Sequence, residues 1–105
     1  MAHPQPLDLA ELDGVIHEPA RLGVMALLIG GDEVEFMLLH ERLGLTKGNL
    51  GAHLRKLEDA GYVRCVKSFV GRKTRTAYRI APKGRAAFVR HVAALERVIK
   101  ANGAD

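Results

Sequence analysis

Asn49, Arg55 and Lys56 are spaced so that one side of a helix could present them together to a nucleic acid. An asparagine amide can pair with adenine through two hydrogen bonds, and an arginine can reach guanine or a phosphate. Three small residues share this side and would let the backbone approach a groove closely: Gly48, Gly51 and Ala52. On a merely solvated side, each glycine would cost about 1 kcal/mol relative to alanine for no gain. We therefore interpret this side as a DNA-contacting surface, with a solvated helix face as the alternative.

The helix that carries this surface has a start signal, a buried stripe and a stop signal. Thr46 is a candidate N-cap, and the helix amino terminus beside Lys47 would attract a phosphate. Gly61 is suited to end the helix. His53 lies about 60° from the buried stripe, which favours a half-buried packing role and leaves groove contact as the alternative. The stripe itself is predicted to consist of Leu50, Leu54 and Leu57.

A second basic cluster follows in residues 71–75, which we expect to form the loop of a β-hairpin. Its cations repel one another unless an anion neutralises them, so contact with phosphates or an adjacent minor groove is predicted. An ordinary solvated loop is the alternative. The residues assigned to this contact are Arg72, Lys73, Thr74 and Arg75.

Apolar spacing and turn residues predict the remaining elements. A short helical segment is expected from Leu7 to Ile16, and a helix that Gly30-Gly31 ends is expected to begin at Pro19. The elements that follow are a short extended piece at 34–36, a helix at 37–43, strands at 62–70 and 76–80, and a helix at 82–101. Alternation in the first long strand is uneven, so it could contain a bulge. In the second, Tyr78 and Ile80 are expected to face inward.

Length and charge bound the class of protein. The 105 residues predict a single domain, with a flexible arm at 1–6, a core at 18–81 and the last helix at 82–101. Residues 1–46 hold two basic and eight acidic side chains, whereas residues 47–105 hold fourteen basic and four acidic ones. This asymmetry favours a polyanionic partner for the second half. The single cysteine, Cys65, and the absence of a signal-peptide pattern or a long apolar run predict a cytoplasmic protein without a membrane partner.

The last helix carries a longer apolar stripe than one small core requires. We interpret it as the seam of a homodimer, and purely intramolecular packing is the alternative. The expected interface consists of Leu7, Leu9, Leu12, Phe88, Val92, Leu95 and Ile99. A dimer would suit palindromic DNA with half-sites about one helical turn apart.

The run His53-Leu54, Leu57 and Gly61-Tyr62-Val63 resembles the recognition-helix region of winged-helix transcriptional regulators of the MarR-like and ArsR-like type. Residues 68–80 and 82–85 are similar to their wing and following helix, and the likeness covers about residues 18–88. It implies an α+β, mainly α fold: a winged helix-turn-helix with a two- to three-stranded antiparallel sheet and a long C-terminal dimerisation helix. Together with the basic surfaces and the apolar last helix, it leads to the hypothesis of a homodimeric transcriptional regulator that binds double-stranded DNA sequence-specifically and acts as a repressor. Gly51 and Ala81 depart from the pattern, where relatives commonly carry serine and threonine.

Other functions find less support in the residues. A winged-helix protein-interaction module, with its basic face on an acidic partner, is the alternative function. The sequence shows no nucleophile–base pair, phosphate loop or paired cysteines, so no enzyme activity, catalytic residue, metal or cofactor is expected. The identity of any small-molecule effector stays open.

Overall fold

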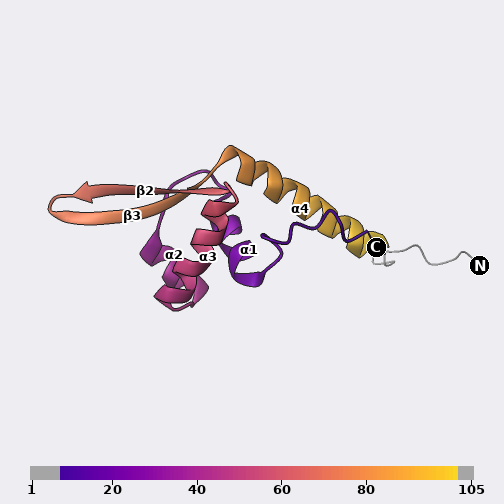
Figure 1. Cartoon of the computed structure of the whole chain (residues 1–105), viewed down its shortest axis with the longest axis horizontal. Coiled ribbons are helices and arrows are strands. Elements are labelled where there is room, and N and C mark those ends of the chain that lie inside the picture. The colour runs from indigo at the N-terminus through magenta and orange to yellow at the C-terminus, as the bar shows by residue number, and fades with distance from the viewer. Residues whose placement is uncertain (1–7, 102–105) are drawn as a thin grey trace, which may run out of the picture.

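The computed structural model describes residues 8–101, and its helices lie around the base of a projecting β-hairpin (Figure 1). The elements in chain order are α1 (Pro19–Leu28), β1 (Val34–Glu35), α2 (Phe36–Leu43), α3 (Lys47–Asp59), β2 (Val63–Val70), β3 (Lys73–Ile80) and α4 (Pro82–Ala101). The described part of the chain is thus mainly helical with one antiparallel three-stranded sheet of order β1-β3-β2, as the sequence predicts. None of these helices is both long and apolar enough to cross a membrane.

The hairpin is longer and more regular than predicted. Strands β2 and β3 pair in continuous register from Val63 opposite Ile80 to Val70 opposite Lys73, so the uneven alternation of the first strand does not reflect a bulge. The loop between them is only Gly71-Arg72, because Gly71 adopts a φ of 65° that permits a tight turn. Three residues assigned to the loop therefore belong to β3, and the hairpin projects far from the helices (Figure 1). We call this hairpin, residues 63–80, the wing.

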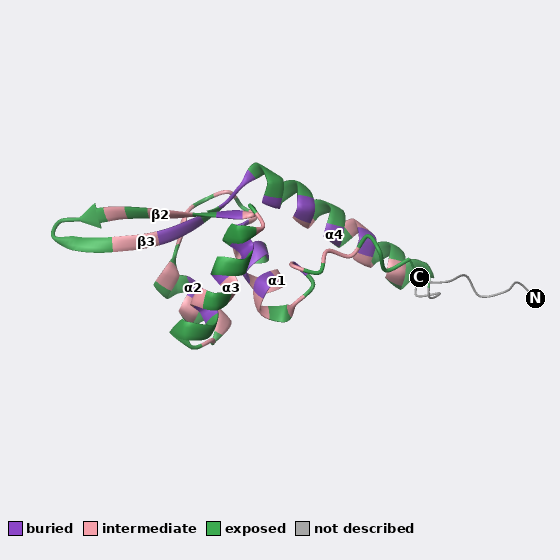
Figure 2. Ribbon diagram, viewed as in Figure 1, coloured by how far each residue is buried: buried purple, intermediate pink, exposed green. Residues whose placement is uncertain are grey.

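The core lies where α1, α2 and α3 meet the base of the wing. The predicted leucine stripe of α3 is confirmed, since all three of its leucines have no exposed surface. Tyr78 and Ile80 are buried and Arg79 is exposed, as alternation predicts. Burial decreases along the wing toward its tip (Figure 2). The largest fully buried apolar side chains are Ile16, Val24, Met25, Leu28, Leu39, Leu50, Leu54 and Leu57.

Residues 8–18, which we call the N-terminal strap, form turns, so the short helix predicted at Leu7–Ile16 is wrong over its described part. The Asp13 carboxylate accepts hydrogen bonds from the N–H groups of Val15 and Ile16, at 2.9 and 3.2 Å. Such side-chain bonds to nearby backbone compete with helix formation. Leu7 itself lies outside the described residues.

Asp13 also joins the strap to the turn before β2 and to α4. The Tyr62 hydroxyl donates to Asp13 Oδ2 at 2.5 Å, and the Asp13 N–H donates to Nδ1 of His91 at 3.0 Å. Nε2 of His91 lies 3.2 Å from His17 Nδ1. Burial, together with the hydrogen bond to Asp13, raises the pKa of Tyr62 to about 12. His91 has no exposed surface, and its burial and the neighbouring His17 lower its pKa.

Helix α4 joins the core through a close backbone contact. The Ala81 N–H donates to the Tyr62 carbonyl at 2.9 Å, just before the helix begins. A Cβ placed on Gly84 would lie 2.0 Å from the same carbonyl oxygen, so only glycine fits there. Beyond this contact α4 extends away from the other helices toward the strap (Figure 1).

Candidate nucleic-acid interface

The amino-terminal half of α3 presents its polar and small residues outward. Thr46 caps the helix as predicted, because its Oγ1 accepts from the Asn49 N–H at 3.1 Å. A Cβ added to Gly48 or Gly51 would meet nothing within 4 Å. Gly51 is half-buried, whereas the other members of this predicted surface are exposed: Thr46, Lys47, Gly48, Asn49, Ala52, Arg55 and Lys56. The helix therefore offers an open face on which a groove could approach the backbone.

His53 points toward α1 and is half-buried, which agrees with its position beside the leucine stripe. Its Nδ1 lies 3.1 Å from Arg21 Nη1 and 3.4 Å from Glu18 Oε2. Arg21 is itself held by a 2.6 Å hydrogen bond from Nε to the Val15 carbonyl. His53 thus connects α3 to the start of α1, and a contact with DNA stays a prediction for this residue.

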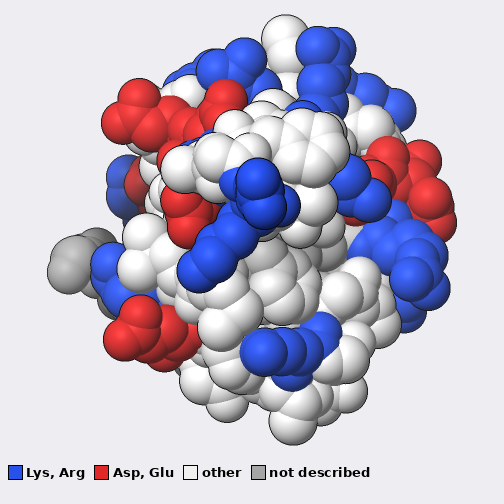
Figure 3. All heavy atoms as spheres, turned by 90° about the vertical axis from the view of Figure 1, so that its left-hand side faces the viewer, with Lys and Arg blue, Asp and Glu red and all other residues white. Residues whose placement is uncertain are grey.

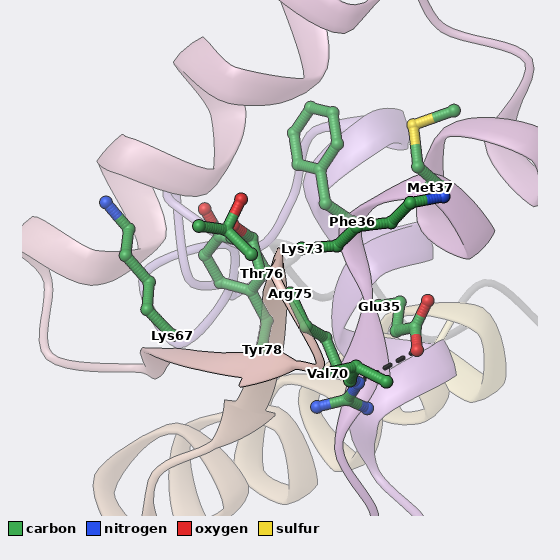
Figure 4. A pocket seen from close by; sticks show the side chains of 10 residues that line it. Glu35, Phe36, Met37, Lys67, Val70, Lys73, Arg75, Thr76 and Tyr78 are labelled. Carbon is green, nitrogen blue, oxygen red and sulfur yellow. Dashed lines mark hydrogen bonds and ion pairs between the residues drawn. The ribbon is translucent and has the colours of Figure 1, made fainter.

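Arg75, which we expected beside the other loop cations, is paired with carboxylates of the segment around β1. Its Nε donates to Glu35 Oε1 at 2.8 Å (Figure 4). Its Nη1 donates to Glu33 Oε1 at 3.1 Å. The hydrogen bonds that Arg75 donates to Glu35 and Glu33 raise the pKa of its guanidinium. Much of its charge is therefore balanced within the protein, whereas Arg72, Lys73 and Thr74 are exposed near the tip of the wing.

Lys67 is a further cation of this region that sequence reasoning missed. It lies opposite Thr76 in the ladder, two residues beyond the pair formed by Cys65 and Tyr78, and it shares their side of the sheet. Figure 4 shows its side chain extending along one wall of a cavity of about 660 Å³ between the wing and the start of α2. Residues two apart in a strand lie on the same side of the sheet, so the spacing from Cys65 indicates which side Lys67 occupies once the pairing of Cys65 is known.

Basic side chains are distributed among uncharged residues over the face that the wing presents (Figure 3). Viewed from the wing end of the molecule, Lys and Arg lie at the centre, the top and the right of the face, and acidic residues gather at the sides (Figure 3). Within residues 8–101, no group of three or more His, Cys, Asp or Glu side chains is arranged to hold a metal ion. The predicted interface is thus a surface of cations and small residues on α3 and the wing.

Known proteins share the sequence pattern and the fold of this chain. A family model described as a winged helix DNA-binding domain matches residues 20–99. An uncharacterized protein of Methanocaldococcus jannaschii is 40% identical over 78 residues, which are 74% of this chain and 85% of that protein.

Solved structures of transcriptional regulators resemble this chain as well. A transcriptional regulator homologue from Pyrococcus horikoshii OT3 superposes with a TM-score of 0.77 at 34% identity, covering 82% of this chain and 85% of that one. The transcriptional repressor CouR, solved on a 23-mer DNA duplex, gives a TM-score of 0.70 at 25% identity, covering 84% of this chain and 61% of CouR. The arrangement of α1–α3 with a wing, and the match over most of the sequence, show that this chain belongs to the winged helix DNA-binding domain family.

Proposed function

We propose that this protein is a homodimeric, sequence-specific regulator of transcription that places α3 in the major groove of double-stranded DNA. The observation that carries the proposal is the outward side of α3, where Gly48 and Gly51 leave the helix surface open beside exposed cations. In this geometry Asn49 reads base edges, while Lys47 and the helix amino terminus bind phosphate. The wing then binds the flanking backbone or minor groove with Arg72 and Lys73.

The homodimer is proposed from the uncovered apolar side of α4. Val89, Val92 and Ile99 are 59%, 37% and 49% exposed, and Leu9 of the strap is 56% exposed. A second copy would remove this apolar surface from water, which favours association. Three other residues of the predicted seam, Leu12, Phe88 and Leu95, are half-buried within the chain and would add less area. A symmetric pair would present two copies of α3 to half-sites about 34 Å apart, or one helical turn.

A repressor role is the simplest regulatory outcome of such binding, because a dimer on a promoter excludes other proteins from it. CouR, which resembles this chain with a TM-score of 0.70, is a transcriptional repressor. The match covers 61% of CouR, and we propose the same role for this chain.

Selection of duplexes from a genomic library by the purified protein, followed by mobility-shift titration, tests the proposal. Asn49→Ala should weaken binding to the enriched sequence and relax base preference, whereas Arg72→Ala should weaken binding to all sequences. Removing one phosphate-binding cation should lower the slope of log affinity against log salt by about 0.9. Lys100→Ala, at the far end of α4, is the control that should leave both properties unchanged.

Three outcomes would each contradict a part of the proposal. An equal loss on every sequence from Asn49→Ala would remove its base-reading role. Absence of even micromolar binding to any duplex at moderate salt would favour the alternative, in which the basic face meets an acidic protein. Sedimentation of the protein as a monomer at micromolar concentration would contradict the proposed dimer.

A further inference from the structure

The tip of the wing carries two large apolar side chains that contact little of the protein. Phe69 is 76% exposed and Val70 is 65% exposed, more than any other large hydrophobic residue in the part of the chain that the structure describes. Burying a phenylalanine is worth roughly 1.5–3 kcal/mol. Burying this side chain against a partner would therefore stabilise the complex substantially. Phe69 and Val70 lie at the tip of the wing, next to Arg72 and Lys73.

Phe69 lies on the side of the wing that faces α3. Phe69 pairs with Thr74 and lies four residues after Cys65 in the same strand. Cys65 pairs with Tyr78, which lies close enough to Arg55 and Glu58 of α3 to interact with their charges. Because side chains alternate along a strand, Phe69 shares that side and Val70 lies on the opposite one. The two residues are thus neighbours in sequence that differ in orientation toward the proposed DNA.

The reach of the wing matches the spacing of DNA grooves. Four residues at about 3.4 Å each carry Phe69 roughly 14 Å beyond Cys65 at the base of the wing. Half a helical turn of DNA, the step from a major groove to the adjacent minor groove, is about 17 Å. With α3 in the major groove, the tip of the wing therefore arrives at the neighbouring minor groove.

We propose that Phe69 is an apolar wedge that enters this minor groove and partly inserts between two base pairs, a role that rests on the proposed DNA-binding function. The exposed cation Arg72, in the turn at the tip of the wing, holds a phosphate beside it. Apolar side chains that enter a minor groove in this way unstack a step and bend the duplex toward the major groove. Flexible pyrimidine–purine steps are the easiest to open, so the wing adds sequence preference through deformability rather than base-edge contacts.

Tryptophan fluorescence tests the orientation directly, because the chain contains no tryptophan. Phe69→Trp and Val70→Trp each introduce one fluorophore at adjacent, exposed positions of the 105-residue chain. The probe is the duplex enriched by selection, cut to about 30 base pairs or three helical turns. On binding, the emission of the Phe69→Trp variant should be quenched and protected from acrylamide, whereas the fluorophore of the Val70→Trp variant should keep most of its accessibility.

Bending gives a second, independent measurement. With donor and acceptor dyes at the two duplex ends, the wild-type protein should raise the transfer efficiency, and Phe69→Ala should return it toward the value of the free duplex. Loss of stacking should weaken binding by roughly 5- to 150-fold. The salt slope should not change, since no charge is removed. Phe69→Leu, which keeps an apolar wedge, should retain most of the bend.

The outcomes separate the two proposals. Suppose that the wild-type protein shifts the duplex. If the fluorophores of the two tryptophan variants are then equally accessible, or if Phe69→Ala bends DNA as the wild type does, the wedge is wrong and the DNA-binding function stands. If no duplex is shifted by the wild-type protein, the proposed function itself fails and the wedge fails with it.

Discussion

Replacing Gly48 and Gly51 by alanine should make the protein more stable and a weaker DNA binder. Neither residue has a positive φ, and an added Cβ meets nothing within 4 Å at either position. Alanine in a helix interior is favoured over glycine by about 1 kcal/mol. Because Gly48 lies in the first turn, where the gain is smaller, the double variant should gain about 1–2 kcal/mol. In a domain of this size, each kcal/mol raises the Tm by roughly 4–8 °C.

The loss of affinity has a separate origin. Both new methyl groups stand on the side of α3 that must approach the groove, next to the proposed base-reading residue Asn49. Disturbing one bidentate base contact costs about 1–3 kcal/mol, which is roughly a 5- to 150-fold loss of affinity. Stability and binding should therefore move in opposite directions, a combination that a general folding defect does not produce.

Urea titration and mobility-shift titration of the same preparations measure the two effects. Gly30→Ala is the matched control, because Gly30 also has open space for a Cβ but lies in the turn after α1. It should leave DNA affinity unchanged. A more stable double variant with wild-type affinity on the selected duplex would refute the close approach of this helix face to DNA. Failure of the variant to gain stability would refute the interpretation of these glycines as unstrained helical positions.

Three further outcomes are expected. Gly84→Ala should destabilise the protein by about 3 kcal/mol or more in urea titration, because its Cβ would clash with the Tyr62 backbone, which cannot move aside cheaply. Thr46→Ala should cost about 1 kcal/mol by removing the cap of α3, again by urea titration. Burial lowers the pKa of His91 below its unfolded value of 6.5. The contribution of His91 to the free energy of unfolding should therefore be complete above pH 6.5 and decrease as the pH falls below 6.5. Thermal unfolding from about pH 8 to about pH 5 should show a smaller loss in His91→Gln than in the wild type.

Local signals were sufficient for most elements of this fold. The capped start of α3, its leucine stripe and the glycine after it are all properties of adjacent residues, and helical spacing alone predicts which side is buried. Pro82 similarly predicts the start of α4. The strap was predicted wrongly because the carboxylate of Asp13 satisfies the backbone N–H groups that a helix would have used.

The environment of individual cations could not be predicted in the same way. Arg75 meets Glu33 and Glu35 only because β1 pairs with β3 across about 40 residues of sequence. Lys67 faces the α3 side of the wing only because the ladder has no bulge between residues 63 and 80. Both placements depend on the register of the strands, and local composition does not specify that register. A slip of one residue would move each side chain to the other side of the sheet.

The strap also bears on the order in which the chain assembles. The wing joins residues close in sequence around a two-residue turn, whereas the hydrogen bonds from the strap to α4 join residues 74 and 78 positions apart. Loop-closure entropy and contact order both favour the local pairing first and the distant closure last. Hydrogen exchange should therefore find the N–H of Asp13 less protected than those of the wing's base, and a nascent chain cannot complete this closure until His91 has left the ribosome.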